Sequence, residues 1–169
     1  TQWSSSAASD VYKRQQVGDT APDLDNPELF KQFFTCIQSL IAKDLILSYH
    51  DRSDGGLYVA VTEMAIAGRK GYELNLDALI NSDCPDSSKF ETLFNEELGA
   101  VIEIDSERLA ELESMIESFG LSAICHAIGK TTAEKSGRII QQSEIIYENT
   151  ITELTVSYTH LTLPTTTIV

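Results

Sequence analysis

Residues 45–67 of this chain read LILSYHDRSDGGLYVAVTEMAIA, and this stretch decides the expected fold. The apolar run at 45–49 has the length and content of a strand, whereas apolar residues recur at helical spacing between Leu57 and Ala67. The segment between them, His50–Gly56, consists of polar residues and glycine. It is therefore expected to join a strand to a helix, at the positive helix end where anions and their metal ions are readily held.

The composition limits what the protein can bind. The chain has 169 residues, enough for one domain that buries roughly two thirds of its unfolded surface. Its net charge of −14 opposes binding to nucleic acid or to an anionic membrane, so phosphates would require a metal ion. Neither a membrane span nor a secretory signal is predicted. The three cysteines, Cys36, Cys84 and Cys125, have no metal-ligand spacing, which indicates reduced thiols in a cytoplasmic protein without structural zinc.

The two ends differ from the rest of the chain. Residues 1–15 lack the acidic, amphipathic character of the region from 16 to 155, and residues 156–169 are rich in threonine and contain no Asp, Glu, Lys or Arg. The strings SAASDVYKRQ and VSYTHLTLPT resemble translated adapter or vector sequence. We therefore expect non-native tails at 1–15 and 156–169 around a native domain at 16–155, the alternative being ordinary disordered termini.

Capping residues and apolar spacing predict the elements of the 16–155 region. A helix is expected to begin at Asn26-Pro27, and a later helix to begin at Ser106 and stop at Gly120. The core-facing stripe of the first helix is predicted to be Phe30, Phe33, Phe34, Ile37, Leu40 and Ile41. Two further helices are expected at about 56–67 and at Lys89–Glu97, with a turn at Ser136-Gly137. The expected strands are 45–50, Tyr72–Leu76, Ala100–Ile104, Ala123–Gly129, Arg138–Gln141 and Ile145–Tyr147.

Strands that alternate with helices predict helices packed on a sheet, while the closing strands have no helix between them. The expected fold class is α+β, a layered sandwich in which helices pack on a mixed sheet. The region stops abruptly at 150–155, so any native element beyond it is expected to be missing.

The 50–56 segment combines several groups that suit a magnesium nucleotide. Asp51 or Asp54 could supply the hard oxygen ligand that Mg²⁺ prefers. The hydroxyl and amide of Ser53 and the amides of Gly55 and Gly56 could donate to phosphate oxygens, and glycine lets the backbone approach closely. The structural alternative is that Asp54 caps the helix, Gly55-Gly56 is a turn and His50 ends the strand.

A second candidate is the segment 95–99, Asn-Glu-Glu-Leu-Gly, which places two carboxylates at a predicted helix end. Carboxylates there oppose the helix dipole, which suggests a role beyond helix stability, although a solvated charged end is the simpler interpretation. Cys84 has no neighbouring base in the sequence and receives no nucleophilic role. No catalytic residue is assigned.

Four ordered motifs carry a resemblance to a known family: GDTAPDL at 18–24, YHDRSDGGL at 49–57, EMAIAG at 63–68 and LFNEELGAV at 93–101. In these strings the chain resembles phosphoribosylformylglycinamidine synthase in its large single-chain form, over most of residues 16–150. The shorter relatives in the aminoimidazole ribonucleotide (AIR) synthetase superfamily resemble it in layout only. The resemblance implies the fold of the AIR synthetase C-terminal domain.

The resemblance also implies a function. The family uses ATP, Mg²⁺ and glutamine-derived ammonia to convert formylglycinamide ribonucleotide into its amidine during purine biosynthesis. By resemblance, Asp51 is a magnesium ligand and Ser53 contacts the nucleotide, ATP or ADP, with Gly55 and Gly56 in the same loop. The long form has two pseudo-equivalent nucleotide sites, and this half would serve the auxiliary, structural one.

The resemblance implies partners as well. The glycine-rich ATP segment, the sheet domain with the other magnesium carboxylates and the glutaminase domain have no counterpart in this sequence. The chain is therefore expected to be the C-terminal layer of the second synthetase half, truncated at both ends, inactive alone and dependent on the other synthetase half and the glutaminase domain.

Two other functions remain open from the sequence. The first is a stand-alone, non-catalytic dimerisation or interaction module of the AIR synthetase superfamily, which would use the 50–56 segment only as a structural turn. The second is a small free-standing nucleotide-binding enzyme, which would need a further phosphate-cradling loop and more than one carboxylate site for metal.

Overall fold

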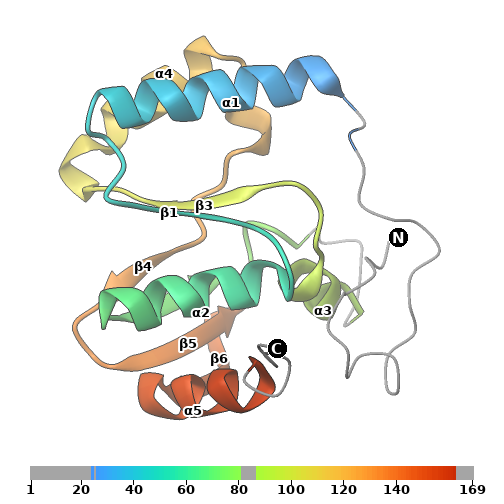
Figure 1. Cartoon of the computed structure of the whole chain (residues 1–169), viewed down its shortest axis with the longest axis vertical. Helices are drawn as coiled ribbons and strands as arrows, with labels where there is room; N and C mark the ends of the chain where they lie inside the picture. Colours follow the sequence, from blue (N-terminus) through green and yellow to red (C-terminus); the bar gives the residue numbers. More distant parts are fainter. Residues whose placement is uncertain (1–23, 25, 81–86, 163–169) are drawn as a thin grey trace, which may run out of the picture. The chain divides into compact units, whose positions relative to one another are not determined.

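The computed structural model describes residues 24, 26–80 and 87–162, and it divides into two compact units. Unit 1 comprises the chain up to Ala60 together with Phe90–Ala127, and unit 2 comprises Val61–Lys89 together with the chain from Ile128 onward. Most of the two predicted tails, most of the 18–24 motif and Cys84 lie outside the described residues. Figure 1 shows the helices and strands of both units.

Helices and a two-stranded antiparallel sheet make up the described part of unit 1. Helix α1 spans Pro27–Ala42, and helix α4 spans Leu109–Ser118. Strand β1, Ser48–Asp51, pairs with strand β3, Ala100–Glu103. The predicted start of α1 is confirmed: the Asn26 side chain accepts a hydrogen bond of 3.0 Å from the Leu29 N–H, and proline follows the cap.

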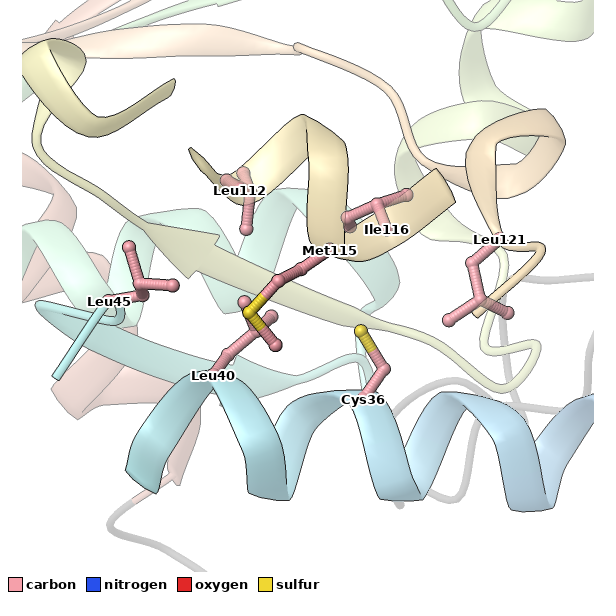
Figure 2. Packing of buried hydrophobic residues seen from close by; sticks show 7 residues of the cluster. All are labelled: Cys36, Leu40, Leu45, Leu112, Met115, Ile116 and Leu121. Carbon is pink, nitrogen blue, oxygen red and sulfur yellow. The ribbon is translucent and has the colours of Figure 1, made fainter. Parts of the chain in front are cut away.

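The core of unit 1 lies between α1 and α4 (Figure 2). It consists of Cys36, Leu40, Leu45, Leu112, Met115, Ile116 and Leu121. The predicted apolar stripe of α1 is partly wrong, because Phe30, Phe34 and Ile41 are 41%, 57% and 49% exposed. The buried face instead centres on Cys36 and Leu40, with Leu29, Phe33 and Ile37 partly buried against the cluster. Phe33, Ile37 and Leu40 of the predicted stripe therefore lie on the packed face, and the other three predicted residues do not.

The predicted start at Ser106 of the helix that ends at Gly120 is also corrected. Its capping residue is Asp105, whose carboxylate accepts from the Glu107 N–H at 2.9 Å, and a short 3₁₀ helix, η2 (Ser106–Arg108), precedes α4. The predicted stop is confirmed at Gly120, which has φ +71°. Helix α3 spans Ser87–Phe94, so it ends three residues before the predicted Glu97.

Unit 2 contains a four-stranded sheet in the order β4-β2-β5-β6. Strands β2 and β5 pair in parallel, whereas the β2–β4 and β5–β6 pairs are antiparallel, so the predicted mixed sheet is confirmed. The buried hydroxyls of Thr62 and Tyr72 lie 3.2 Å apart and tie helix α2 to β2. The bounds are α2 Gly56–Gly68, β2 Gly71–Asn75, β4 Gly129–Thr132, β5 Ser136–Gln141 and β6 Glu144–Thr150.

Three local predictions are wrong. The strand expected at 123–129 is replaced by a 3₁₀ helix, η3 (Ser122–Ile124), and irregular chain, and the strand begins only at Gly129. The pair Ser136-Gly137, predicted as a turn, begins β5, and the chain between β4 and β5 bends at 133–135 instead. The β5–β6 hairpin turns at Gln142 and Ser143, both with positive φ. Strand β1 begins at Ser48 rather than at 45, because Leu45 packs into the core of unit 1.

Helix α5, Ile151–Thr162, follows β6 directly and contacts it (Figure 1). It begins with a capping box: the Thr150 hydroxyl accepts from the Glu153 N–H at 3.2 Å, and the Glu153 carboxylate accepts from the Thr150 N–H at 3.1 Å. The helix runs across residue 155, where the native region is predicted to end.

Candidate functional site

The polar segment between β1 and α2 forms a tight loop, which we call the 51–56 loop. Asp51 is the last residue of β1, and α2 begins at Gly56. The Gly56 N–H donates to the Ser53 carbonyl at 2.9 Å. Gly55 and Gly56 have φ of +80° and +66°, the left-handed region that favours glycine. The expected strand–loop–helix junction is therefore present.

The structure brings the two candidate segments of the sequence together. In the β1–β3 pair, Asp51 lies opposite Ala100, so the residue after β1 faces the residue before β3. The Arg52 N–H accordingly donates to the Gly99 carbonyl at 2.8 Å. The 51–56 loop and the 95–99 segment thus form one site within unit 1.

Arg52, which has no role in the sequence-based prediction, connects these two segments. Its Nε donates to the Glu97 carbonyl at 2.6 Å, and its Nη2 donates to the Leu98 carbonyl at 3.2 Å. Burial lowers the pKa of the Arg52 guanidinium, and the Glu97 carboxylate acts in the opposite direction. The guanidinium therefore binds the protein backbone at the edge of the loop.

Glu96 supplies the carboxylate at the start of α2. Its Oε1 accepts from the Gly55 N–H at 3.1 Å. The alternative in which Asp54 caps this helix is not supported, because within 26–80 and 87–162 the exposed Asp54 carboxylate accepts no hydrogen bond from a backbone N–H. Since α3 already ends at Phe94, the Glu96 carboxylate interacts with the positive end of α2, a favourable arrangement.

Gly56 lies against the backbone at the C-terminal end of α3. A Cβ at this position would lie 2.7 Å from the Asn95 carbonyl oxygen and 2.8 Å from the Leu93 carbonyl oxygen. The rings of Tyr58 and Phe94 pack nearby with centroids 5.6 Å apart. The first turn of α2 therefore depends on glycine at this position for its close backbone contact.

Asp51, Ser53 and Asp54 are the exposed residues of the 51–56 loop, and Asp51 and Ser53 carry the carboxylate and the hydroxyl expected to contact a magnesium nucleotide. Among the described residues, no hydrogen bond or ion pair engages the Asp51 carboxylate. Burial raises the pKa of the neighbouring Tyr49, and the negative charge of Asp51 raises it further. An exposed carboxylate at a strand end fits Mg²⁺ as one ligand among several, with water or phosphate oxygens completing the shell.

The rest of the metal shell would have to come from elsewhere. The described part of the chain contains no group of three or more His, Cys, Asp or Glu side chains that could hold a metal ion. The His50 ring lies 2.7 Å, through Nδ1, from the Asp51 carbonyl oxygen. The amides of Gly55 and Gly56 donate to Glu96 and Ser53, so in this conformation they already have acceptors.

The contributions of Arg52 and Glu96 were not found from the sequence. The sequence signal for Arg52 was its position between the two candidate ligands Asp51 and Ser53. The signal for Glu96 was the pair of carboxylates in the 95–99 segment. Neither signal identifies a backbone acceptor some 45 residues away in the sequence, as in the Arg52–Glu97 hydrogen bond.

The remaining sequence features take no part in this site. Cys36 and Cys125 are free thiols; Cys36 is buried, which raises the pKa of its thiol, and Cys125 is exposed. No helix in the described ranges has the length and apolar character needed to cross a membrane.

Comparison with known proteins gives this arrangement a context. Residues 3–142 match the family model described as AIR synthase related protein, C-terminal domain. The phosphoribosylformylglycinamidine synthase of Schizosaccharomyces pombe is 40% identical over 142 residues, which cover 83% of this chain and 10% of the relative. The chain therefore spans about a tenth of the length of this curated relative.

Solved structures share the fold. T. maritima PurL complexed with FGAR matches with a TM-score of 0.69 and 16% identity, covering 86% of this chain and 24% of that chain. T. maritima PurL complexed with ATP matches with a TM-score of 0.65 and 18% identity, covering 91% and 24%. At these identities the likeness establishes the fold, and it confirms the predicted α+β architecture.

Proposed function

The chain belongs to the AIR synthase related protein family, C-terminal domain, and on that premise we propose that it is part of a phosphoribosylformylglycinamidine synthase. That enzyme would be a C–N ligase of purine biosynthesis that uses ATP and glutamine-derived ammonia to convert formylglycinamide ribonucleotide into its amidine. The 40% identity to the S. pombe synthase supports the assignment. The chain would act in the cytoplasm and contribute one side of a nucleotide site.

The 51–56 loop is the observation that supports the nucleotide site. It exposes Asp51 and Ser53 while the 95–99 segment holds its other side through Arg52 and Gly55. Solved structures that share the fold are complexed with ATP, ADP and AMPPCP. The nucleotide would be ATP or ADP, at a site that is auxiliary rather than catalytic.

Each loop residue has a proposed contribution. Asp51 would be the magnesium ligand, and the ion, when bound, would offset phosphate charge in this acidic protein. Ser53 would donate its hydroxyl to a phosphate oxygen, and Gly55 and Gly56 would provide the turn and the close backbone approach. No catalytic residue is proposed in this chain.

The missing ligands would come from the rest of the synthase. The described residues contain no group of three or more side chains that could hold a metal ion, and a nucleotide site needs more metal ligands than Asp51 and a phosphate-cradling segment. We expect the other synthetase half to provide them and a glutaminase domain to provide ammonia. Long-read sequencing of the locus tests this: a reading frame that continues into both domains, without 1–15 and 156–169, supports a native region at 16–155.

A titration with Mn²⁺·ADP, followed by NMR, tests the site in the chain itself. Because one carboxylate binds weakly, we expect broadening at millimolar ligand that is strongest for amides of the 51–56 loop. Asp51→Ala should remove that local broadening, whereas the matched control Asp54→Ala, which removes another exposed carboxylate of the same loop, should retain it. Broadening spread evenly over acidic surface residues, or identical for both variants, would refute the assignment.

One observation favours the alternative of an interaction module. Strand β6 is an edge of the unit 2 sheet, and its Ile145, Ile146 and Tyr147 are 55%, 42% and 36% exposed. Exposed edge strands pair readily with other chains. Under this alternative the chain forms a stable oligomer that Ile145→Lys disrupts, and it shows no local effect of Mn²⁺·ADP. Light scattering after size exclusion distinguishes the two functions.

A further inference from the structure

We propose that Arg52 is a positioning residue for the nucleotide loop. By binding the carbonyls of Glu97 and Leu98, it keeps the Glu96 carboxylate on the Gly55 N–H and so fixes the conformation in which the loop presents Asp51. This inference rests on the proposed function for its ligand, but its structural part can be tested without any ligand.

The contacts of Arg52 all point to one segment. Its backbone N–H and two of its guanidinium nitrogens donate to the three consecutive carbonyls of Glu97, Leu98 and Gly99. A Cβ on Gly99 would lie 3.4 Å from the guanidinium carbon, so the group lies directly over this glycine. A planar guanidinium has fixed donor directions and can therefore set the position of the backbone it binds.

The held segment in turn fixes the start of α2. Glu96 immediately precedes the carbonyls that Arg52 binds, and its carboxylate accepts from Gly55. The Asn95 side chain accepts from the Glu97 N–H at 2.6 Å, which folds 95–97 into a local turn. Arg52 and Gly55 thus contact the same short segment from the two ends of the loop, with Ser53 and Asp54 exposed between them.

In this arrangement the Glu96 carboxylate occupies the place at the start of α2 where a bound anion would otherwise lie. With the Gly55 N–H bound to Glu96 and the Gly56 N–H bound to Ser53, nucleotide contact in this conformation falls to the side chains of Asp51 and Ser53. Loss of the Arg52 contacts would release Glu96 and let the loop move. Arg52 would thereby affect nucleotide binding without touching the nucleotide.

The chain contains a matched control for an arginine with a purely structural role. Arg108, also in unit 1, donates to the carbonyls of Asp44 at 2.7 Å and Lys43 at 3.4 Å, and it pairs with Glu111 at 2.9 Å. Arg52→Gln and Arg108→Gln each remove one positive charge and one arginine that binds two carbonyls. Effects of net charge or of general stability are therefore common to both variants.

Solvent exchange of the Gly55 amide, measured by NMR on the 169-residue chain, is the first readout. The Leu45 amide, bonded to the Leu40 carbonyl at 3.0 Å in the core, is the reference. We expect Arg52→Gln to speed Gly55 exchange about tenfold relative to Leu45, the scale of one charge-assisted hydrogen bond. Arg108→Gln should leave this ratio unchanged. Equal ratios in the two variants would overturn the inference.

Affinity for Mn²⁺·ADP is the second readout. We expect Arg52→Gln to weaken binding about tenfold or more, on the scale found for groups that orient metal ligands, while Arg108→Gln binds as the wild type. Arg52→Lys separates charge from geometry, because lysine keeps the positive charge but lacks the planar guanidinium. We therefore expect Arg52→Lys to show more than half of the change that Arg52→Gln causes in Gly55 exchange and in Mn²⁺·ADP affinity. Full recovery in Arg52→Lys, or unchanged affinity in Arg52→Gln, would overturn the positioning role.

The two readouts separate the failure of this inference from the failure of the proposed function. Wild-type chain that shows no local Mn²⁺·ADP effect refutes the nucleotide site and, with it, the ligand part of the inference. The ratio of the Gly55 and Leu45 amide exchange rates would still decide whether Arg52 holds the loop. Wild-type binding that is lost in Asp51→Ala but kept in Arg52→Gln supports the proposed function and refutes the inference.

Discussion

Replacement of Gly56 by alanine should destabilise the protein far more than the same replacement at Gly120. Both glycines have positive φ, +66° at Gly56 and +71° at Gly120, so an alanine pays a similar backbone penalty of about 1–2 kcal/mol at each. Their surroundings differ. A Cβ at Gly120 meets nothing within 4 Å, whereas a Cβ at Gly56 meets three backbone atoms of residues 93–95 at 2.7–2.8 Å.

The steric term can be estimated from this contact. Backbone atoms cannot rotate away as the end of a flexible side chain can, so the overlap must be relieved by moving α2 or the 93–95 segment. Overpacking of this kind costs about 1–3 kcal/mol. We therefore expect Gly56→Ala to lower the free energy of unfolding by about 2–5 kcal/mol and Gly120→Ala by about 1–2 kcal/mol.

Urea denaturation followed by far-ultraviolet circular dichroism measures both values. The variants should have lower midpoints than the wild type at an unchanged slope, with the larger shift for Gly56→Ala. Gly56→Ala should also alter the Gly55 amide resonance, because the displaced 93–95 segment carries Glu96 with it. Equal loss of stability in the two variants would show that the contact at Gly56 is looser than described and would refute the reasoning.

Two further predictions concern unit 2. Tyr72→Phe removes one partner of the buried Thr62–Tyr72 hydroxyl pair and should cost about 1–3 kcal/mol, measured by the same urea titration, whereas the double change with Thr62→Val should cost less than the sum of the single changes. Hydrogen bonds from Thr150 hold the pKa of Glu153 below its usual 4.5, so the stabilisation from these bonds is present above pH 4.5 and is lost as the pH falls through the lowered value. Thermal unfolding measured across this range should show a steeper loss of stability for the wild type than for Glu153→Gln, and parallel profiles would contradict the capping box.

The elements that the sequence predicted correctly have strong local signals. Asn26 followed by proline marks the start of α1 by a side-chain hydrogen bond within three residues, and Gly120 marks the end of the α4 segment by its positive φ. Such signals act within one helical turn and need no knowledge of the rest of the fold. The same holds for α2, which the apolar spacing after Gly56 predicted almost to the residue.

The elements that were missed depend on distant partners. A strand was expected at 123–129, but Leu121 packs into the helical core of unit 1 and the chain forms the 3₁₀ helix η3 at Ser122–Ile124 instead. Strand β4 begins only where Gly129 pairs with Leu74 of β2. A Cβ at Gly129 would overlap the Glu73 carbonyl, so this pairing uses the absence of a side chain, which no hydrophobic pattern reveals.

The candidate site shows the same limit at a larger separation. The sequence singled out the 51–56 loop and the 95–99 segment independently, because each has its own polar and glycine residues. Their meeting follows from the register of β1 and β3: with Asp51 opposite Ala100 in an antiparallel pair, the chain leaving one strand must lie beside the chain entering the other. A shift of one residue would turn the Asp51 side chain to the other face of the strand pair and would offset Arg52 from Gly99. The strand register, rather than the composition of either segment, therefore makes Arg52 and Glu96 part of one site.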